Sequence, residues 1–363
     1  MSALLIDGGV GEAREALVHD GRVIALRVLR QSDEGRRARW FELYAGRVRD
    51  IDKRRRGAFV DLGLRDEMGF LQLHPDGRPS RKRAWTGFAA PEKLPTLTEG
   101  QSIAVCVVRE AARGKSPVLA YVGEASNAPR LLDRHEGDAA LLNAKADLAA
   151  RAEIDAAIEE ALSRTSPIPG GGTLTIEPTS ALVAIDVDAG GRAGQGDAEK
   201  FAFDLNVAAA REAARQVRLR NLGGLVALDF VSMRTKSNLE QLEREVRAAF
   251  ADDPWKVEFG ALSRFGVFEL AREQMCTPLH EIMCEPDGRL RAETLALSAL
   301  RAIEREATGA RGREVLCNVS DEAKAWLGAA PFDWRAALQS RIGVRWRLEG
   351  GAGARDMIDV RLT

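Results

Sequence analysis

Residues 173–190 read TLTIEPTSALVAIDVDAG, and residues 224–230 read GLVALDF. In each stretch a short apolar run ends in acidic residues, which are Asp186 and Asp188 in the first and Asp229 in the second. Short apolar runs bounded by glycine, proline or aspartate are typical of buried strands. We therefore expect two strands here, each with carboxylates at its C-terminal end.

The sequence around these two stretches predicts a layered domain of helices and strands. Residues 198–220 have the apolar spacing of a long amphipathic helix, and Gly223 is placed to end it. Residues 237–240 read SNLE, which has the form of a capping box that opens another helix. Further strands are expected around Val257 and Val267. Strands that alternate with helices indicate a mixed α/β layer.

The first third of the chain predicts β structure instead. Its strand-like segments have the spacing of a small antiparallel barrel, and residues 74–98 would form the long loop of that barrel. A helix with Ile154, Ile158 and Leu162 on one face follows, and the tail from Glu293 alternates helix and strand. The barrel segments are residues 44–49, 57–62, 69–73 and 102–109, after earlier segments at residues 3–7, 15–19 and 22–28.

This organisation predicts an α+β multidomain protein. The chain has 363 residues, enough for about two to three domains at roughly 100–200 residues each. We expect an N-terminal β segment packing with the linker region, a β-barrel, a shortened linker and helical region, an α/β domain and a small α+β C-terminal module. Their expected bounds are residues 1–37, 38–122, 123–171, 172–290 and 291–363, in that order.

Composition is that of an ordinary water-soluble globular protein, with 45% hydrophobic and 29% charged residues. No stretch approaches the roughly 18 consecutive apolar residues of a membrane-spanning helix, and the start does not have the form of a secretion signal. The four cysteines are too scattered for a disulfide framework, and the four histidines suggest neither a metal cluster nor a catalytic pair. We expect a cytoplasmic protein with no membrane partner. The four cysteines are Cys106, Cys276, Cys284 and Cys317, and the four histidines are His19, His74, His135 and His280.

The net charge of −1 hides a strong local segregation of basic residues. Residues 36–56 are rich in Lys and Arg, and a second basic run extends from Arg78 to Arg83. A stripe of this kind can bind a polyanion. A solvated loop or hairpin is the alternative that charge alone leaves open.

The acidic strand ends are the sharpest candidate for chemistry. In α/β domains ligand sites gather outside the C-terminal ends of strands, so Asp186 and Asp229 would face one crevice if their strands are neighbours. Two carboxylates without a nearby His or Cys suit Mg²⁺, which takes one or two carboxylates and keeps several waters. The alternative is that these acids are solvated and only form local turn hydrogen bonds.

Three segments together resemble the ribonuclease E/G family. They are residues 172–190, residues 204–230 and the stretch SRFGVFELAR at residues 263–272. The resemblance implies a deoxyribonuclease I-like α/β catalytic domain over residues 172–290. It also implies a magnesium-dependent endoribonuclease, with Mn²⁺ as a substitute ion, which activates a water to cleave the phosphodiester and leaves a 5′-phosphate and a 3′-hydroxyl.

The resemblance assigns roles to residues of this domain. Asp186 and Asp229 match the magnesium-binding aspartates of the family, and Arg264 matches an arginine close to the catalytic site. Asp188 matches a position that is usually Asn, so it adds a negative charge that either tightens metal binding or raises the pKa of a neighbour. The residues on or near the matching helix are Asn206, Arg218 and Arg220.

The N-terminal part resembles the OB-type RNA-binding barrel of the same family, which is inserted near the N-terminus. In that barrel Phe59 and Phe70 correspond to aromatic residues that stack on bases, with basic residues beside them. Judged from the residues alone, the two rings could equally fill the barrel core. The RNA-binding residues that the resemblance implies are Arg55, Arg56, Phe59, Phe70, Arg109 and Lys115.

The sequence departs from the family at two places. The region from Gly123 to Ala152 is short and has no match to the family's pocket for an RNA 5′-monophosphate. Residues 283–288 read MCEPDG where the family carries Cys-Pro-x-Cys, so the zinc link between two subunits is not expected. Cys276 is too far from Cys284 for a usual zinc spacing. A homodimer held by other contacts stays open.

The leading hypothesis is an endoribonuclease that cleaves single-stranded RNA at a magnesium site formed by Asp186 and Asp229. The target, whether ribosomal RNA, a transfer RNA precursor or messenger RNA, is not fixed by the sequence. One alternative is a non-catalytic RNA-binding protein derived from the family. Another is a metal phosphodiesterase that acts on DNA, which the RNA-type barrel disfavours.

Overall fold

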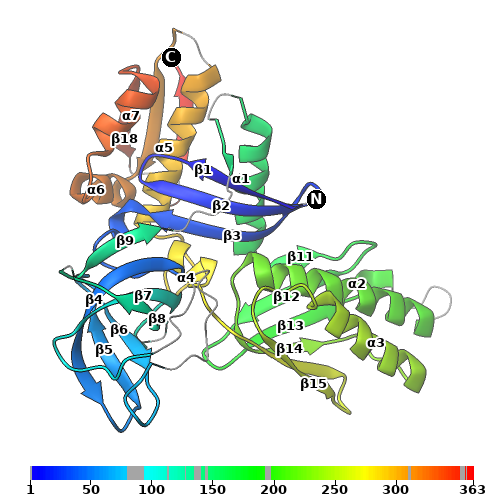
Figure 1. Ribbon diagram of the computed structural model, residues 1–363. Coiled ribbons are helices and arrows are strands. Elements are labelled where there is room, and N and C mark those ends of the chain that lie inside the picture. The colour runs from blue at the N-terminus through cyan, green and yellow to red at the C-terminus, as the bar shows by residue number, and fades with distance from the viewer. Residues whose placement is uncertain are drawn as a thin grey trace. The chain divides into compact units, whose positions relative to one another are not determined.

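A computed structural model of the chain shows two compact units, which we call the barrel unit and the sheet unit (Figure 1). The barrel unit comprises residues 30–138 and 275–277, and the sheet unit comprises residues 1–29, 139–274 and 278–363. Arg81, Lys82, Arg83 and His135 of the sequence analysis lie outside the described residues. The structure describes residues 2–79, 94–112, 114–126, 128–134, 140–143, 146–192, 198–309, 312–351, 356 and 358–363.

The barrel unit is built on five strands that close into a ring, in the order β5-β6-β8-β7-β4, with β4 pairing back onto β5. A sixth strand, β9, pairs with the edge of β4. All pairs in the ring are antiparallel except β6 with β8, so the prediction of a purely antiparallel barrel was wrong at this one pair. The strands are β4 (Glu42–Asp52), β5 (Gly57–Asp61), β6 (Met68–Gln72), β7 (Ser102–Arg109), β8 (Val118–Glu124) and β9 (Arg130–Arg134), preceded by a 3₁₀ turn, η1 (Gln31–Asp33).

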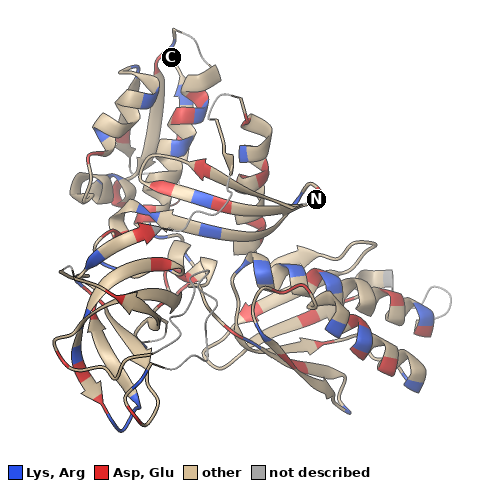
Figure 2. Cartoon of the chain, in the orientation of Figure 1, with Lys and Arg blue, Asp and Glu red and all other residues tan. Residues whose placement is uncertain are grey.

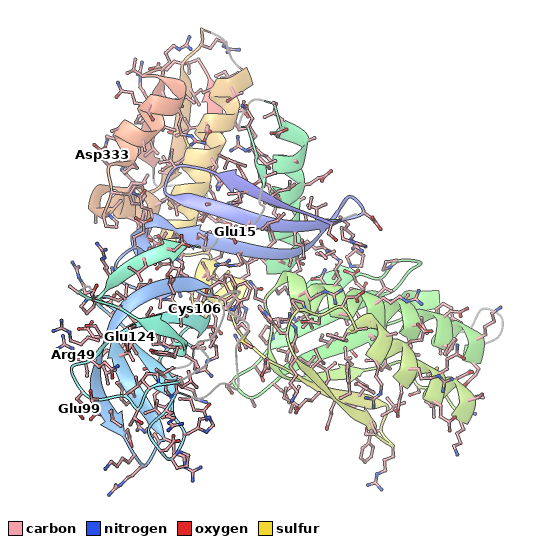
Figure 3. All side chains as sticks on the ribbon, in the orientation of Figure 1. Glu15, Arg49, Glu99, Cys106, Glu124 and Asp333 are labelled. Carbon is pink, nitrogen blue, oxygen red and sulfur yellow. The ribbon has the colours of Figure 1, made fainter. Side chains whose placement is uncertain are left out.

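Alternation along these strands separates a packed interior from a charged exterior. Ala58, Val60 and Leu71 are buried in the barrel core with residues of β4 and β7. Cys106 on β7 is also buried, and its burial raises the pKa of the thiol to about 12 (Figure 3). On the exterior, the Arg49 Nε donates a hydrogen bond of 3.0 Å to Asp61 Oδ2.

The centre of the sheet unit is a six-stranded sheet in the order β11-β12-β13-β14-β16-β15. Only β13 and β14 pair in parallel, because helix α2 carries the chain back between them. Helix α3 follows β14, and Figure 1 shows α2 and α3 side by side against the sheet. The elements are β11 (Thr165–Pro167), β12 (Thr173–Pro178), β13 (Val183–Asp188), η2 (Gly190–Arg192), α2 (Ala198–Leu219), β14 (Gly224–Asp229), α3 (Lys236–Ala249), β15 (Val257–Leu262) and β16 (Val267–Arg272).

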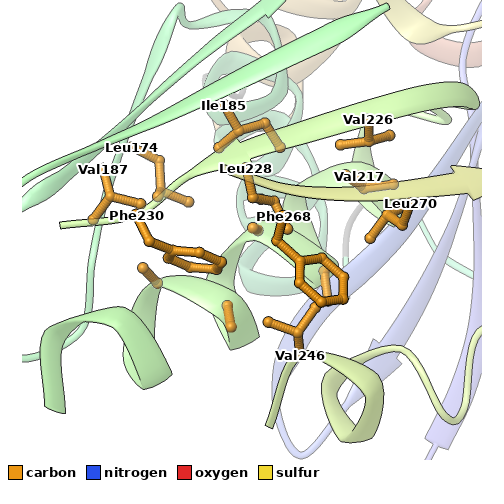
Figure 4. Packing of buried hydrophobic residues seen from close by; sticks show 14 of the residues in the cluster. Leu174, Ile185, Val187, Val217, Val226, Leu228, Phe230, Val246, Phe268 and Leu270 are labelled. Atoms are coloured by element: carbon orange, nitrogen blue, oxygen red, sulfur yellow. The ribbon is translucent and has the colours of Figure 1, made fainter. Parts of the chain in front are cut away.

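One face of this sheet packs against α2 and α3 in a core that Figure 4 shows from close by. Ile185, Leu228 and Phe268 contribute from three neighbouring strands and are at most 1% exposed. Helix α2 contributes Val217 and helix α3 contributes Val246, and both side chains are fully buried. Because side chains alternate along a strand, the residues between the apolar ones project from the opposite face of the sheet.

Two local predictions about these helices were wrong. Helix α3 begins at Lys236, so Ser237 lies inside it and forms no capping box. The Glu199 carboxylate of α2 instead accepts hydrogen bonds from the backbone N–H groups of Arg234 and Thr235. These contacts keep the pKa of Glu199 below its ordinary value. Helix α2 ends at Leu219, and the residue that turns the chain after it is Asn221, with a φ of 54° in the left-handed region, rather than Gly223.

Two smaller sheets complete the sheet unit. One has the order β10-β1-β2-β3 and packs with α1 and α4, and the other has the order β18-β17-β19 and packs with α5, α6 and α7. The first group is β1 (Ser2–Gly8), β2 (Glu12–His19), β3 (Arg22–Arg30), β10 (Ala140–Leu141), α1 (Leu148–Leu162) and α4 (Leu279–Met283). The second is α5 (Ala292–Gly309), β17 (Val315–Ser320), α6 (Asp321–Ala329), α7 (Trp334–Ile342), β18 (Trp346–Gly351) and β19 (Ile358–Leu362).

The fold class predicted from the sequence is confirmed at the level of a mixed α+β chain with a closed barrel and several sheets. The division into five parts stays a prediction. Among the described residues, no helix has the length and apolar character needed to cross a membrane.

Candidate metal and nucleic-acid sites

Asp186 and Asp229 lie side by side at the C-terminal ends of β13 and β14. The parallel register pairs Ile185 with Leu228 and Asp186 with Asp229. Neighbouring strands in a sheet are about 4.8 Å apart, so the two carboxylates leave the backbone at that separation and on the same face. The condition set in the sequence analysis, that the two strands are neighbours, is therefore met. We call Asp186, Asp188 and Asp229 the acid edge.

The acid edge lies on the face of the sheet opposite α2 and α3. Ile185 and Leu228 point into the helix-covered core, and all three aspartates are exposed. Alternation along β13 places Asp186 and Asp188 on the same face, two residues apart. The edge is therefore open to a ligand from solvent while its backbone is fixed by the core on the other side.

Electrostatics show that the carboxylates of the acid edge repel one another. The pKa of Asp186 is raised above its ordinary value, first by partial desolvation and then by the negative charges of Asp229, Asp188 and Glu177. A like charge nearby disfavours ionisation, and a bound cation would reverse that effect. The site therefore carries unbalanced negative charge of the kind that a divalent cation neutralises.

Asp188 differs from the other two acids because its side chain has a local task. Its Oδ1 accepts a hydrogen bond of 2.8 Å from the backbone N–H of Gly190. That bond turns the chain from β13 into η2, as aspartate commonly does at turns. An asparagine could accept the same bond through its amide oxygen. Asp188 therefore makes the turn hydrogen bond that an asparagine could also make, and it adds a negative charge to the acid edge.

The buried Asn206 of α2 fixes the segment that follows Asp229. Its Nδ2 donates to the Val231 carbonyl at 2.8 Å, and its Oδ1 accepts from the Val231 N–H at 3.0 Å. Asn206 is completely buried, so both of its hydrogen-bonding groups need these partners. This role was missed in the sequence, although a lone Asn on the apolar side of an amphipathic helix was the available signal.

Arg264 lies in the turn between β15 and β16, at the same end of the sheet as the acid edge. The register pairs Asp229 with Val267, and the Phe230 N–H donates to the Gly266 carbonyl at 3.4 Å. Arg264 is exposed, and its guanidinium carbon is 4.6 Å from the ring centroid of Phe265. The antiparallel pairing of β14 and β16 thus carries Arg264 to the edge that holds Asp229.

The donor set of the acid edge fits Mg²⁺. The described residues contain no group of three or more His, Cys, Asp or Glu side chains placed to hold a metal ion. Mg²⁺ does not require such a group, because one or two carboxylates, waters and substrate oxygens complete its shell. The in-register carboxylates of Asp186 and Asp229 provide that smaller set.

Arg218 and Arg220 have structural roles. The Arg220 guanidinium is buried and donates to the carbonyls of Ser163 and Glu160 and to Gln216 Oε1. Burial lowers the pKa of Arg220 to about 10. Arg218 is half-buried and donates to the Ala249 carbonyl at 3.3 Å. Both side chains therefore anchor the C-terminal end of α2 to neighbouring backbone.

The barrel unit gathers five of the six predicted RNA-binding residues into one pocket of about 590 Å³. The sixth, Arg56, occupies the turn between β4 and β5 with a φ of 51° and is exposed beside the pocket residue Arg55. Figure 2 shows the basic residues that gather on this end of the barrel unit. The pocket is lined by Arg55, Phe59, Phe70, Gln72, Arg109, Gly114, Lys115, Ser116 and Val118.

The two phenylalanines of this pocket are not part of the barrel core. Phe59 and Phe70 face each other across the β5–β6 pair, with ring centroids 5.5 Å apart, while their neighbours Ala58 and Leu71 point inward. The Phe70 ring lies over Gly57, where an added Cβ would come within 2.1 Å of it. Core filling, the alternative left open by the sequence, therefore does not account for either ring.

Basic groups surround these rings. The Arg55 guanidinium carbon is 6.0 Å from the Phe59 ring centroid. Arg109 reaches the Ser116 carbonyl through Nη2 at 3.3 Å, which holds its side chain along the pocket wall, and Lys115 is exposed at the rim. Aromatic faces flanked by cations suit a single-stranded nucleic acid, because bases stack and phosphates pair with the charges.

The two cysteines considered for zinc belong to different units. Cys276 is buried in the barrel unit, and Cys284 is half-buried at the end of α4 in the sheet unit. Cys284 pairs through its backbone with Leu290. The expectation that zinc does not bind here stays a prediction.

The segment that contains the acid edge matches a known protein family. Residues 123–275, which contain the whole acid edge, Asn206 and Arg264, match the Ribonuclease E/G family. This segment of the chain is therefore similar to the ribonuclease E/G family. The matched segment does not include the barrel residues Phe59 and Phe70, so the account of the pocket rests on its geometry.

Several relatives in this family are similar over part of their length. The chain is 38% identical to ribonuclease E of Escherichia coli strain K12 over 170 residues, 45% of this chain and 16% of the relative. It is 41% identical to a chloroplastic ribonuclease E/G-like protein of Arabidopsis thaliana over 136 residues, 37% of this chain and 14% of the relative. Ribonuclease G of Haemophilus influenzae is 29% identical over 146 residues, 39% of this chain and 30% of the relative. The match thus spans under a third of each of these relatives.

The acid edge predicts a metal response in thermal unfolding. Asp186→Asn and Asp229→Asn should each raise the unfolding midpoint in EDTA, because each removes one member of a repelling pair. Mg²⁺ should raise the midpoint of the wild type, since a ligand of the folded state stabilises it by mass action. The two variants should lose that response. Glu269→Gln is the matched control. It removes an exposed acid on β16, two residues from the Val267 that pairs with Asp229, and it should keep the response to Mg²⁺. An equal Mg²⁺ response in all four proteins would contradict the assignment.

The barrel pocket predicts how binding of a single-stranded oligonucleotide should depend on its aromatic rings and on its positive charges. Phe59→Ala and Phe70→Ala should each weaken binding of a single-stranded oligonucleotide by roughly 1–3 kcal/mol, the usual value of one stacked base. Arg55→Ala should instead reduce the slope of log affinity against log salt by about one. Fluorescence anisotropy at several salt concentrations measures both effects. Arg49→Ala, on the barrel exterior but outside the pocket, is the control. Ring variants that bind as the wild type does would exclude stacking.

Proposed function

We propose that this protein is a magnesium-dependent endoribonuclease of the ribonuclease E/G type that cleaves single-stranded RNA. The observation that carries the proposal is the register of Asp186 with Asp229 on the open face of the sheet, inside the segment that matches the family. The names of the relatives, ribonuclease E and ribonuclease G, supply the expectation that the substrate is RNA.

The residues of the acid edge have distinct tasks in this mechanism. Asp186 and Asp229 would hold the ion, with Asp188 adding negative charge beside them. A bound Mg²⁺ supplies an activated water and neutralises charge on the phosphate. Arg264 presents a planar set of donors to the non-bridging phosphate oxygens. The buried amide of Asn206 holds the segment after Asp229 in place. The expected products are a 5′-phosphate and a 3′-hydroxyl.

The barrel would contribute RNA binding rather than cleavage. Bases stack on Phe59 and Phe70, and Arg55, Arg109 and Lys115 lie beside the backbone phosphates. Stacking of this kind requires unpaired bases, which is why we propose a single-stranded substrate. Within this proposal the barrel is of the OB type and the α/β domain is deoxyribonuclease I-like.

Two departures from the family's sequence pattern bear on substrate preference and assembly. Without a match to the family's 5′-monophosphate pocket, cleavage should not depend on the phosphorylation state of the RNA 5′ end. Without the Cys-Pro-x-Cys sequence, any homodimer would form without a zinc link. We place the protein in the cytoplasm, acting on ribosomal RNA, transfer RNA precursors or messenger RNA.

Cleavage of a labelled single-stranded RNA in Mg²⁺ tests the proposal. The wild type should cut, and Asp186→Asn and Asp229→Asn should lose on the order of a thousandfold in rate, the scale of several kcal/mol of metal stabilisation. Both variants should still bind the RNA, because the barrel pocket is unchanged. Glu269→Gln should cleave at the wild-type rate, since its charge lies off the acid edge.

Two outcomes would contradict the proposal. A wild type that binds RNA but never cuts it, in Mg²⁺ or Mn²⁺, would be a non-catalytic RNA-binding protein. A wild type that cuts matched single-stranded DNA better than RNA would be a DNA phosphodiesterase.

A further inference from the structure

An aromatic ring stands in solvent next to the acid edge. Phe265 is 74% exposed, whereas every other aromatic residue in the part of the chain that the structure describes is buried or half-buried. It belongs neither to the core between the sheet and its helices nor to the residues packed against that core. Its ring therefore contributes little to the stability of the sheet.

The turn that carries Phe265 is tightly held. Gly266 donates to the Ser263 carbonyl at 3.0 Å, and Ser263 donates to the Val267 carbonyl at 2.8 Å. The Ser263 hydroxyl accepts from the N–H groups of Phe265 and Val267 at 3.3 Å each. Gly266 has a φ of +87°, which other residues rarely adopt. The ring is thus presented by a defined backbone.

Strand register places this turn at the acid edge. Val267 is the partner of Asp229, and Gly266 accepts the hydrogen bond from Phe230. The ring therefore begins two residues beyond the strand position opposite Asp229. Two residues of backbone span at most about 7 Å. The ring is therefore within reach of an unpaired base attached next to a phosphate held at Asp229.

Arg264 supports the ring from one side. Its guanidinium carbon lies 4.6 Å from the ring centroid, within the range of a cation–π contact. This contact orients the ring and leaves most of its surface exposed. The same guanidinium is our candidate to contact the phosphate. Arg264 would therefore contact both the Phe265 ring and the phosphate.

We propose that Phe265 stacks on the base of a nucleotide adjacent to the phosphate that is cut, and so positions the RNA at the acid edge. The inference rests on the proposed function and adds to it a second stacking point besides the barrel pocket. A base that stacks on Phe265 must be unpaired. The local requirement for single-stranded RNA would then arise at the cut itself as well as at the barrel.

The experiment compares wild type, Phe265→Ala, Phe265→Leu and Phe265→Trp on a series of RNA oligonucleotides. Each oligonucleotide carries one abasic nucleotide, moved stepwise across the cleavage site, and kcat/KM is measured in Mg²⁺. The leucine keeps apolar bulk and removes the ring, whereas the tryptophan keeps a ring. Leu225→Ala is the control, because Leu225 is also exposed and lies at the opposite end of β14.

The proposal expects one sensitive position. With wild type, the abasic nucleotide next to the cut should lower kcat/KM about tenfold or more, the loss of one stacked base. Phe265→Ala and Phe265→Leu should show a similar loss on intact RNA and no further loss on the abasic RNA. Phe265→Trp should restore the wild-type pattern, and Leu225→Ala should retain it.

Two results would overturn the inference and leave the proposed function standing. One is cleavage of intact RNA by Phe265→Ala and Phe265→Leu at the wild-type kcat/KM. The other is an abasic penalty that persists undiminished in both variants. A wild type that fails to cleave any of the oligonucleotides in Mg²⁺ is a separate outcome, which overturns the proposed function and this inference with it.

Discussion

The parallel pairing of β13 with β14 is the contact on which the site depends. It is the only parallel pair in a six-stranded sheet, and it sets Asp186 opposite Asp229. A slip of one residue in either strand would turn its aspartates into the apolar core and its apolar side chains to solvent. Burial of Ile185 and Leu228 under α2 and α3 therefore fixes the register, and the register fixes the separation of the carboxylates.

Helix α2 couples this core to the rest of the sheet unit. Its small buried residues, Ala209, Ala210 and Ala213, are completely buried in the core between the sheet and its helices. Its Glu212 and Arg215 form a buried ion pair, 2.7 Å between Oε1 and Nη2. Arg215 also donates to the Val23 carbonyl of β3 at 3.1 Å. One helix thus anchors the segment after Asp229 through Asn206 and ties the central sheet to the N-terminal one.

The sequence predicted those features that short-range patterns specify. The apolar runs before Asp186 and Asp229 predicted two strands with a long amphipathic helix between them, and the structure shows that these strands are paired. The capping box at Ser237 was wrong because α3 begins at Lys236, and the backbone just before it is held by the distant Glu199 carboxylate. The end of α2 was misplaced because Asn221 adopts the left-handed conformation usually given to glycine.

Features made by distant residues could not be read from local patterns. The parallel pairing of β6 with β8 and the pairing of β4 with β7, which complete the ring, join strands that lie far apart in the chain. Resemblance, rather than periodicity, pointed to Phe59 and Lys115, which lie far apart in the chain and meet in one pocket. Phe265 was passed over because exposure, its distinguishing property, is not visible in a sequence.

The most direct test of the central claim, that Asp186 and Asp229 together hold one metal ion, is a crystal structure with Mn²⁺ and its anomalous scattering. We predict one anomalous peak on the open face of the sheet, bonded to a carboxylate oxygen of each aspartate, and no such peak in Asp229→Asn. A peak bound elsewhere in the protein, or a wild-type crystal in which these two carboxylates bind no ion, would contradict the account.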